Sequence, residues 1–228
     1  MLTMGIDTAL SHCSVAIMFD EQVLAENSVL LTRGHAEQIG PMVREICALA
    51  DVSVLDFDRI GVVVGPGSFA GVRVGLAFAR GLQIDGGPQI VGVSSLQGLA
   101  LGVHDDGEDK NILALIDARQ GYFYAAVFDR DAKVIAPPFI GNRNLIEETV
   151  FAAAKGRKVL LCGPAAGDFI QIGNLAGSAS ENTHIDAKEI ANFCACYSGA
   201  KQNVSPLYLR PPDAAPKKTG RYSAVYDK

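Results

Sequence analysis

The chain contains two similar hairpin sequences, and this repeat constrains the fold more than any other feature. Each copy is an apolar strand that ends in Asp, a polar turn and a returning apolar strand. Ile116-Asp117 stands 110 residues after Ile6-Asp7 (117 minus 7), and Ala125-Ala126-Val127 follows Val15-Ala16-Ile17 at the same offset. Two related hairpins in 228 residues predict a duplicated domain. Two unrelated hairpins are the alternative, because the match is short.

Apolar patterning assigns the same order of elements to both halves. Three strands come first, and helices alternating with strands follow, which predicts an α/β protein with mixed sheets. In the first half we expect strands at 2–7, 13–19, 22–30, 60–64 and 89–93, and helices at about 36–50, 71–84 and 94–102. In the second half we expect strands at 112–117, 122–128, 133–136 and 158–162, and helices near 143–154 and 187–199.

The acidic stretch from His104 to Lys110 is the best boundary between the halves. It predicts a first domain at 1–104 and a second at 105–210. Several prolines follow Val204, so we expect residues 211–228 to form a mobile tail. Within the first domain, Pro41 either kinks the helix at 36–50 or marks its start.

A glycine-rich segment, Gly65-Pro66-Gly67-Ser68-Phe69-Ala70-Gly71, joins a β-branched strand to an apolar helix. Such a link directs backbone N–H groups and the positive end of a helix dipole at one spot, where an anion or a partner backbone can approach. It is not a P-loop, because no Lys follows the last glycine. It is not an esterase elbow either, because Pro66 and Ala70 occupy the glycine positions around Ser68. On this segment alone, a tight structural turn is favoured.

Composition and charge exclude several classes of protein. The chain is 49% hydrophobic, which is enough for one large or two small cores. Its formal net charge of −5 argues against unaided nucleic-acid binding. Five cysteines without a C-x-x-C pair suit buried thiols in a reducing compartment. No apolar run is long enough to cross a membrane, so we expect a cytoplasmic protein that does not bind membranes.

The motifs described above and four further segments match one known family. The matching segments are Ile6-Asp7-Thr8, Cys13–Ala16, the segment from His35, Gly65–Gly75, Gly92–Leu96, Ile116–Arg119 and Pro206–Arg210. Together they resemble the TsaB (YeaZ) family, the bacterial partner subunits in making N6-threonylcarbamoyladenosine in tRNA. The similarity spans about residues 2–210. Its most specific part is Gly65–Gly75, although Ala70 stands where the family usually has Thr.

The resemblance implies a duplicated RNase H-like fold of the actin, sugar kinase and Hsp70 type, in agreement with the repeat. It implies a non-catalytic subunit that pairs with its catalytic relative TsaD, is joined by the ATPase TsaE, and meets tRNA only through that complex. A homodimer is expected when the partner is absent. We expect no cofactor in the isolated chain, and we expect ATP or ADP only at the joint with the partner.

The resemblance also implies that the first-half helices meet the partner. The expected interface residues are His35, Gln38, Met42, Glu45, Ser68, Phe69, Arg73, Ala77 and Arg80. Arg73 and Arg80 stand seven residues apart and share a helix face. Exposed arginines are common anchors of interfaces.

Candidate nucleotide-binding residues lie at the ends of the repeated strands. In ATP-using members of the fold, two hairpin aspartates hold Mg²⁺ through waters, and glycines after them let the phosphates reach the backbone. No such glycine run follows Asp7 or Asp117 here, so structural roles are favoured over ligand roles. The candidates are Asp7, Thr8, Gly65, Gly67, Ser68, Asp117 and Arg119, and the Gly163–Gly167 turn stands where an adenosine-binding loop would lie.

The paired-histidine motif of a metal-binding helix is missing from the sequence, and a metal site made from distant residues is the less favoured alternative. The catalytic relative uses an H-x-x-x-H pair, and Ser95 and Leu99 take those places here. We therefore predict neither a catalytic residue nor a metal site. A free-standing ATP-dependent kinase is the main alternative, and a peptidase would need a metal or nucleophile constellation that the sequence does not show.

Overall fold

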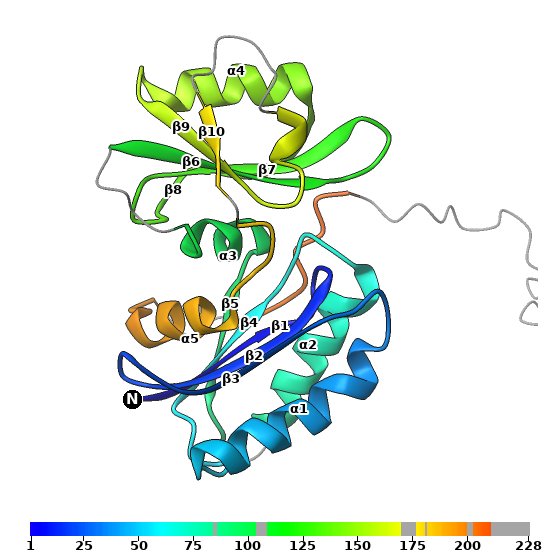
Figure 1. The fold of residues 1–228 in the computed structure, drawn as a ribbon, viewed down its shortest axis with the longest axis vertical. Helices are drawn as coiled ribbons and strands as arrows, with labels where there is room; N and C mark the ends of the chain where they lie inside the picture. Colours follow the sequence, from blue (N-terminus) through cyan, green and yellow to red (C-terminus); the bar gives the residue numbers. More distant parts are fainter. Residues whose placement is uncertain (84–85, 104–108, 170–176, 181, 200–202, 211–228) are drawn as a thin grey trace, which may run out of the picture.

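The first half of the chain forms a five-stranded mixed sheet in the order β3-β2-β1-β4-β5 (Figure 1). The computed structural model describes residues 1–83, 86–103, 109–169, 177–180, 182–199 and 203–210. Antiparallel neighbours β1 (Leu2–Asp7), β2 (His12–Phe19) and β3 (Gln22–Leu30) form one side of the sheet. Strands β4 (Arg59–Val63) and β5 (Gln89–Val93) continue it in parallel from β1.

The second half repeats this arrangement in a separate sheet with the order β10-β9-β6-β7-β8. Its strands are β6 (Lys110–Asp117), β7 (Tyr122–Phe128), β8 (Val134–Asn142), β9 (Lys158–Cys162) and β10 (Gly177–Ala179). Strands β6, β7 and β8 are antiparallel, and β9 and β10 run parallel to β6. Each sheet therefore begins with a meander of three strands and grows by parallel strands on the other side. The duplication predicted from the repeat is confirmed.

Helices form three layers around the two sheets (Figure 1). Helices α1 (His35–Ala50) and α2 (Phe69–Leu82) cover the outer face of the first sheet, and α4 (Arg143–Ala154) covers the outer face of the second. Helices α3 (Ser95–Leu101) and α5 (Ala187–Cys196) lie between the sheets. A short 3₁₀ helix, η1 (Gly167–Phe169), follows β9.

The two central helices are exchanged between the halves. Helix α3 follows the first sheet in the chain but packs against β6 and β7, whereas α5 follows the second sheet but packs against β1, β2 and β4. The division at residues 104 and 105 therefore describes the order of the chain and not its packing. The second domain predicted at 105–210 stays a prediction; in the structure its sheet packs against α3, and its helix α5 packs against the first sheet.

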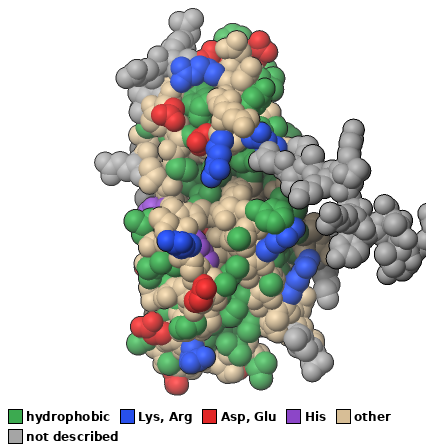
Figure 2. Space-filling view, turned by 90° about the vertical axis from the view of Figure 1, so that its right-hand side faces the viewer, with side chains coloured by type: hydrophobic (Ala, Val, Ile, Leu, Met, Phe, Trp, Pro, Cys, Tyr) green, Lys and Arg blue, Asp and Glu red, His purple; other side chains and the backbone are tan. Residues whose placement is uncertain are grey.

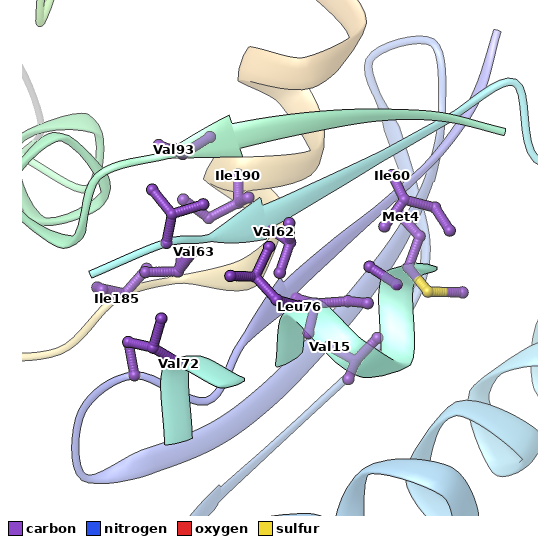
Figure 3. Close-up of a cluster of buried hydrophobic side chains, with 14 of the residues drawn as sticks. Met4, Val15, Ile60, Val62, Val63, Val72, Leu76, Val93, Ile185 and Ile190 are labelled. Carbon is purple, nitrogen blue, oxygen red and sulfur yellow. The ribbon is translucent and has the colours of Figure 1, made fainter. Parts of the chain in front are cut away.

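Strand alternation divides the apolar side chains between two cores. On β6, Leu113 and Leu115 face α4, and Ile112 and Ile116 face the central layer. The larger core joins the first sheet to α1, α2 and the central helices (Figure 3). In Figure 3, Val72 and Leu76 of α2 and Ile190 of α5 lie around the strands from opposite faces of the sheet.

Several element boundaries differ from the sequence expectations. Pro41 lies inside α1, so the alternative that the helix starts after Gly40 is wrong. Helix α2 begins at Phe69 and not at residue 71, because Ser68 caps it: the Ser68 Oγ accepts the Gly71 N–H at 3.2 Å. Strand β8 extends to Asn142, helix α5 ends at Cys196, and β10 was not expected.

All five cysteines are free thiols; Cys13, Cys47, Cys162 and Cys194 are buried, whereas Cys196 is exposed. No helix among the described residues is long and apolar enough to cross a bilayer. His104 and the predicted tail at 211–228 lie outside the described residues.

Candidate functional site

The β1–β2 turn carries Asp7, the first aspartate of the repeat. Asp7 is fully buried, and its Oδ1 accepts the Ala9 N–H at 2.8 Å. Its Oδ2 has no hydrogen-bond partner among the described residues. Burial raises the pKa of Asp7 to about 7, and the Ala9 N–H opposes this shift only in part. Ser14 faces Asp7 across the strand pair, and its Oγ is likewise buried without a partner in the described chain.

The β6–β7 turn repeats this local geometry in the second half. The Asp117 Oδ1 accepts the Arg119 N–H at 2.7 Å, two residues along, as Asp7 does with Ala9. Arg119 has a left-handed backbone with φ of 67°. Asp117 and Arg119 are both exposed. The two aspartates therefore share this hydrogen bond to the second residue after them, but their turns differ in backbone conformation and in solvation.

The glycine-rich segment packs directly onto the β1–β2 turn. A Cβ on Gly71 would overlap the Thr8 carbonyl oxygen, and a Cβ on Gly67 would overlap the Ala9 carbonyl oxygen. The Thr8 Oγ1 donates to the Gly71 carbonyl oxygen at 2.7 Å. These glycines thus let two segments of the same chain approach each other, and the approaching backbone is not that of a ligand.

Two of the N–H groups that an anion would need are used within the chain. The Ser68 N–H donates to the Ala9 carbonyl oxygen at 2.8 Å, and the Gly71 N–H donates to the Ser68 Oγ. Gly65 is buried and its carbonyl oxygen accepts the Ser95 N–H at 2.8 Å. The structural interpretation of this loop is therefore favoured over a phosphate site.

The Gly163–Gly167 turn is also occupied by the chain itself. Gly163 has φ of 97°, and a Cβ there would overlap the Leu115 carbonyl oxygen. Its N–H donates to the Asn182 carbonyl oxygen at 2.8 Å. An adenine base could bind at this turn, where an adenosine-binding loop was expected, only by displacing these contacts.

Two histidines that are far apart in sequence meet near the β1–β2 turn. The rings of His12 and His184 stack with centroids 4.8 Å apart. Burial, and then the neighbouring His184, lower the pKa of His12. In the part of the chain that the structure describes, no group of three or more His, Cys, Asp or Glu side chains is arranged to hold a metal ion.

One row of side chains on helix α2 faces residues 203–210. Phe69, Arg73 and Arg80 are exposed and share this row. The Arg73 guanidinium lies 3.7 Å from the centroid of the Phe69 ring, and its Nε donates to the Tyr208 Oη at 2.9 Å. The Phe69 and Tyr208 rings stack with centroids 5.5 Å apart.

Residues 203–210, which we call the strap, run from the first half to the second. The Arg80 Nη2 donates to the Val204 carbonyl oxygen at 2.6 Å, and the Leu207 N–H donates to the Val64 carbonyl oxygen at 2.7 Å. At the other end, Arg210 donates to Ala118 O and Gln120 Oε1, both at 3.0 Å. Arg73 and Arg80, expected to be free anchors for a partner, therefore hold the strap.

A second row on α2 borders α1. Ala70 and Val74 line a pocket of about 240 Å³ with His35, between the starts of the two helices. Ala77 and Gly81 continue this row and are exposed. On α1, Gln38 is half-buried and Glu45 is exposed.

Met42 was expected at the partner interface, and this prediction is wrong. It is fully buried in the larger core, because it belongs to the apolar stripe that faces the sheet, and it cannot meet a partner. No local pattern indicates the Phe69–Arg73–Tyr208 contact, since Arg73 and Tyr208 stand 135 positions apart.

The doubled meander sheets, the exchanged central helices and the aspartate turns at equivalent strand ends define a protein of the actin, sugar kinase and Hsp70 class, as predicted. The model of the family described as "TsaD: tRNA N6-adenosine threonylcarbamoyltransferase" matches residues 25–201, and the chain belongs to this family.

Curated relatives place the chain near the TsaB proteins. "tRNA threonylcarbamoyladenosine biosynthesis protein TsaB" of Escherichia coli K12 is 39% identical over 131 residues, which cover 58% of this chain and 56% of that protein. The protein of the same name from Haemophilus influenzae is 33% identical over 148 residues, covering 64% and 62%. The matches thus span little more than half the length of these relatives. They confirm the predicted TsaB (YeaZ) resemblance.

A solved structure shares the whole fold. YeaZ from Pseudomonas aeruginosa superposes with a TM-score of 0.75 at 21% identity, covering 91% of this chain and 99% of that one. This likeness concerns the arrangement of the backbone.

Proposed function

We propose that the chain is a non-catalytic subunit in the biosynthesis of threonylcarbamoyladenosine in tRNA, where it binds and positions a TsaD-like catalytic subunit. The names of the TsaB relatives, which are biosynthesis proteins for tRNA threonylcarbamoyladenosine, support a role of the chain in this biosynthesis. One observation carries the non-catalytic role: the start of α2 packs onto the β1–β2 turn, and backbone groups of Thr8 and Ala9 fill the space beside Gly67 and Gly71. In this reading, a TsaE-like ATPase joins the pair, and ATP or ADP binds only at the joint.

The partner surface in this proposal is α1 together with the row of α2 that borders it. Ala70, Ala77 and Gly81 form a line of small residues, and helices approach each other closely over such lines. Gln38 and Glu45 supply polar contacts at the edge. The same surface would form a homodimer of the chain when the partner is absent.

Association with the partner tests the proposal directly. The purified chain should co-elute with a TsaD-like subunit in the presence of ATP, and its depletion should remove the modification from tRNA. Calorimetry of the isolated chain with Mg-ATP separates this function from the kinase alternative. Tight stoichiometric binding that Asp7→Ala abolishes would favour a kinase and contradict the proposal.

Ala77→Arg should raise the dissociation constant of this association by about tenfold or more, without unfolding the chain. Ala77 is exposed, so the new side chain meets solvent in the free protein but clashes in the complex. The measurement is the dissociation constant with the partner, beside the melting temperature. Phe151→Arg is the matched control: Phe151 is 80% exposed on α4, at the other end of the molecule. Equal loss in both variants would rule out this surface.

A further inference from the structure

The face formed by the strap and the neighbouring row of α2 is rich in arginine and aromatic side chains. Phe69 is 55% exposed and Tyr208 is 48% exposed although their rings stack on each other. Exposed aromatic rings that are held in place form a platform on which another planar group can stack at low entropic cost. Arg73 fixes both rings, through its contact with Phe69 and its hydrogen bond to Tyr208.

The positive charges beside this platform are not neutralised by acidic neighbours on these elements. Among the described residues, Arg73 contacts a hydroxyl group and aromatic rings, and Arg80 contacts a carbonyl oxygen; none of these groups carries a formal charge. Neither α2 nor the strap contains an Asp or a Glu. Within α2 and the strap, no carboxylate offsets the charge of either guanidinium, and the contacts of each guanidinium fix its position.

A third arginine extends the same face toward the second half. Arg210, at the end of the strap, lies against the turn that carries the exposed Arg119. Figure 2 shows Lys or Arg side chains next to hydrophobic ones on the right of this side of the molecule, with no acidic side chain visible between them. Asp117, on the same turn, is an exposed acidic residue beside these arginines. Arg73, Arg80, Arg119 and Arg210 still leave an excess of positive charge over this carboxylate, in a chain whose net charge is −5.

We propose that this arginine–aromatic surface (Phe69, Arg73, Arg80, Arg119 and Tyr208) contacts a single-stranded segment of the tRNA substrate. Exposed bases stack on aromatic side chains and on guanidinium planes, and phosphates pair with arginines. Aromatic and arginine side chains also recur at protein interfaces, and the test below distinguishes RNA from a protein occupant. The inference rests on the proposed function, and it adds a direct contact where the sequence led us to expect only an indirect one.

The surface is distinct from the proposed partner surface. The row of Phe69, Arg73 and Arg80 faces the strap, whereas the row of Ala70, Val74 and Ala77 borders α1. A complex can therefore cover α1 and still leave the arginine–aromatic surface open to RNA.

The test measures tRNA binding by the complex of the chain with its TsaD-like subunit, using fluorescence anisotropy at several salt concentrations. Phe69→Ala removes half of the platform and should weaken binding about tenfold. Arg119→Gln removes one charge and should lower the slope of log K against log salt by about 0.7. The controls are Phe151→Ala and Lys133→Gln, which replace exposed side chains on α4 and before β8.

Unchanged tRNA binding by both test variants would overturn the inference and leave the proposed function standing. Loss of the protein complex in Phe69→Ala would also overturn it, because the surface would then belong to a protein interface. Failure of the wild-type chain to enter a tRNA-binding complex would instead refute the proposed function, and this inference with it. Melting temperatures within a few degrees of wild type exclude unfolding as the cause.

Discussion

Asp7 and Asp117 occupy equivalent positions in the two halves, and burial alone separates their chemistry. Both accept the N–H of the second residue after them. Asp117 is solvated, whereas Asp7 is fully buried, with one oxygen unpartnered in the described chain. A buried carboxylate without a cation is destabilising, so the proton is held more tightly in the folded state.

The pH dependence of stability should therefore reveal Asp7. Its pKa is about 7 in the folded chain against 3.8 in its ordinary state, so folding favours the protonated form. Between pH 4 and pH 7 its contribution should fall as the pH rises, by at most on the order of 4 kcal/mol.

Asp7→Asn should remove this fall and make the protein more stable than wild type at pH 8, since an amide can keep the hydrogen bond from Ala9. The free energy of unfolding of both proteins in urea, at pH 5 and at pH 8, measures this effect. Asp117→Asn is the control, because Asp117 is exposed. A wild-type profile parallel to that of Asp7→Asn would contradict the assignment. The difference between the two proteins also cancels the opposite contribution of His12, whose pKa is lowered.

At the scale of one element, α2 shows how closely a helix can be fitted to a turn. Its N-terminal glycine, Gly71, sits against the Thr8 carbonyl oxygen, whereas Gly81 near its C-terminus has no heavy atom within 4 Å of a Cβ position. Gly71 is thus needed for close packing at one end of the helix, whereas Gly81 at the other end packs against nothing among the described residues.

Gly71→Ala and Gly81→Ala should therefore change stability in opposite directions. The first forces the helix away from the turn and should cost about 1–3 kcal/mol. The second replaces glycine by a better helix former and should add up to about 1 kcal/mol. The free energy of unfolding in urea measures both. Equal effects would mean that the helix and the turn are not in close contact.

At the scale of the whole molecule, the exchange of α3 and α5 joins the halves into one folding unit. A Cβ on Gly5 of β1 would overlap the Ala187 carbonyl oxygen, so the backbone of α5 lies directly on the first sheet. At its other end, the Arg59 Nη1 of β4 donates to the carbonyl oxygens of Cys194, Ala195 and Tyr197 at 2.9, 3.2 and 2.6 Å. A cation placed there also stabilises the helix dipole.

Arg59→Met should lower the free energy of unfolding by about 1–3 kcal/mol, because three carbonyl groups lose one charged donor. The transition should stay single, with fluorescence and circular dichroism coincident, since each sheet is completed by a helix from the other half. Arg44→Met, on the exposed side of α1, serves as the control. Separate transitions for the two halves would contradict the exchanged arrangement.

Local sequence patterns predicted much of the fold. The repeated strand–Asp–turn motif and the alternation of apolar runs with helical stripes predicted the duplication, the mixed sheets and the position of nearly every element. These signals are local, since strand and helix periodicity depend on neighbours a few residues away. The candidate site was harder to predict: Asp7 and the glycine segment were identified from the sequence. The contact of that segment with Thr8 and Ala9, about 60 residues away, was not.

The sequence by itself determined the class of the protein, the repeated architecture and the absence of a paired-histidine motif, because each is written in residue types at short spacing. Only the tertiary structure decided which groups are solvated and which helix completes which sheet. It buried Met42, separated the environments of Asp7 and Asp117, and joined Arg73 to Tyr208. Those outcomes depend on contacts between distant segments, which are set by the packing of the whole chain and not by any local preference.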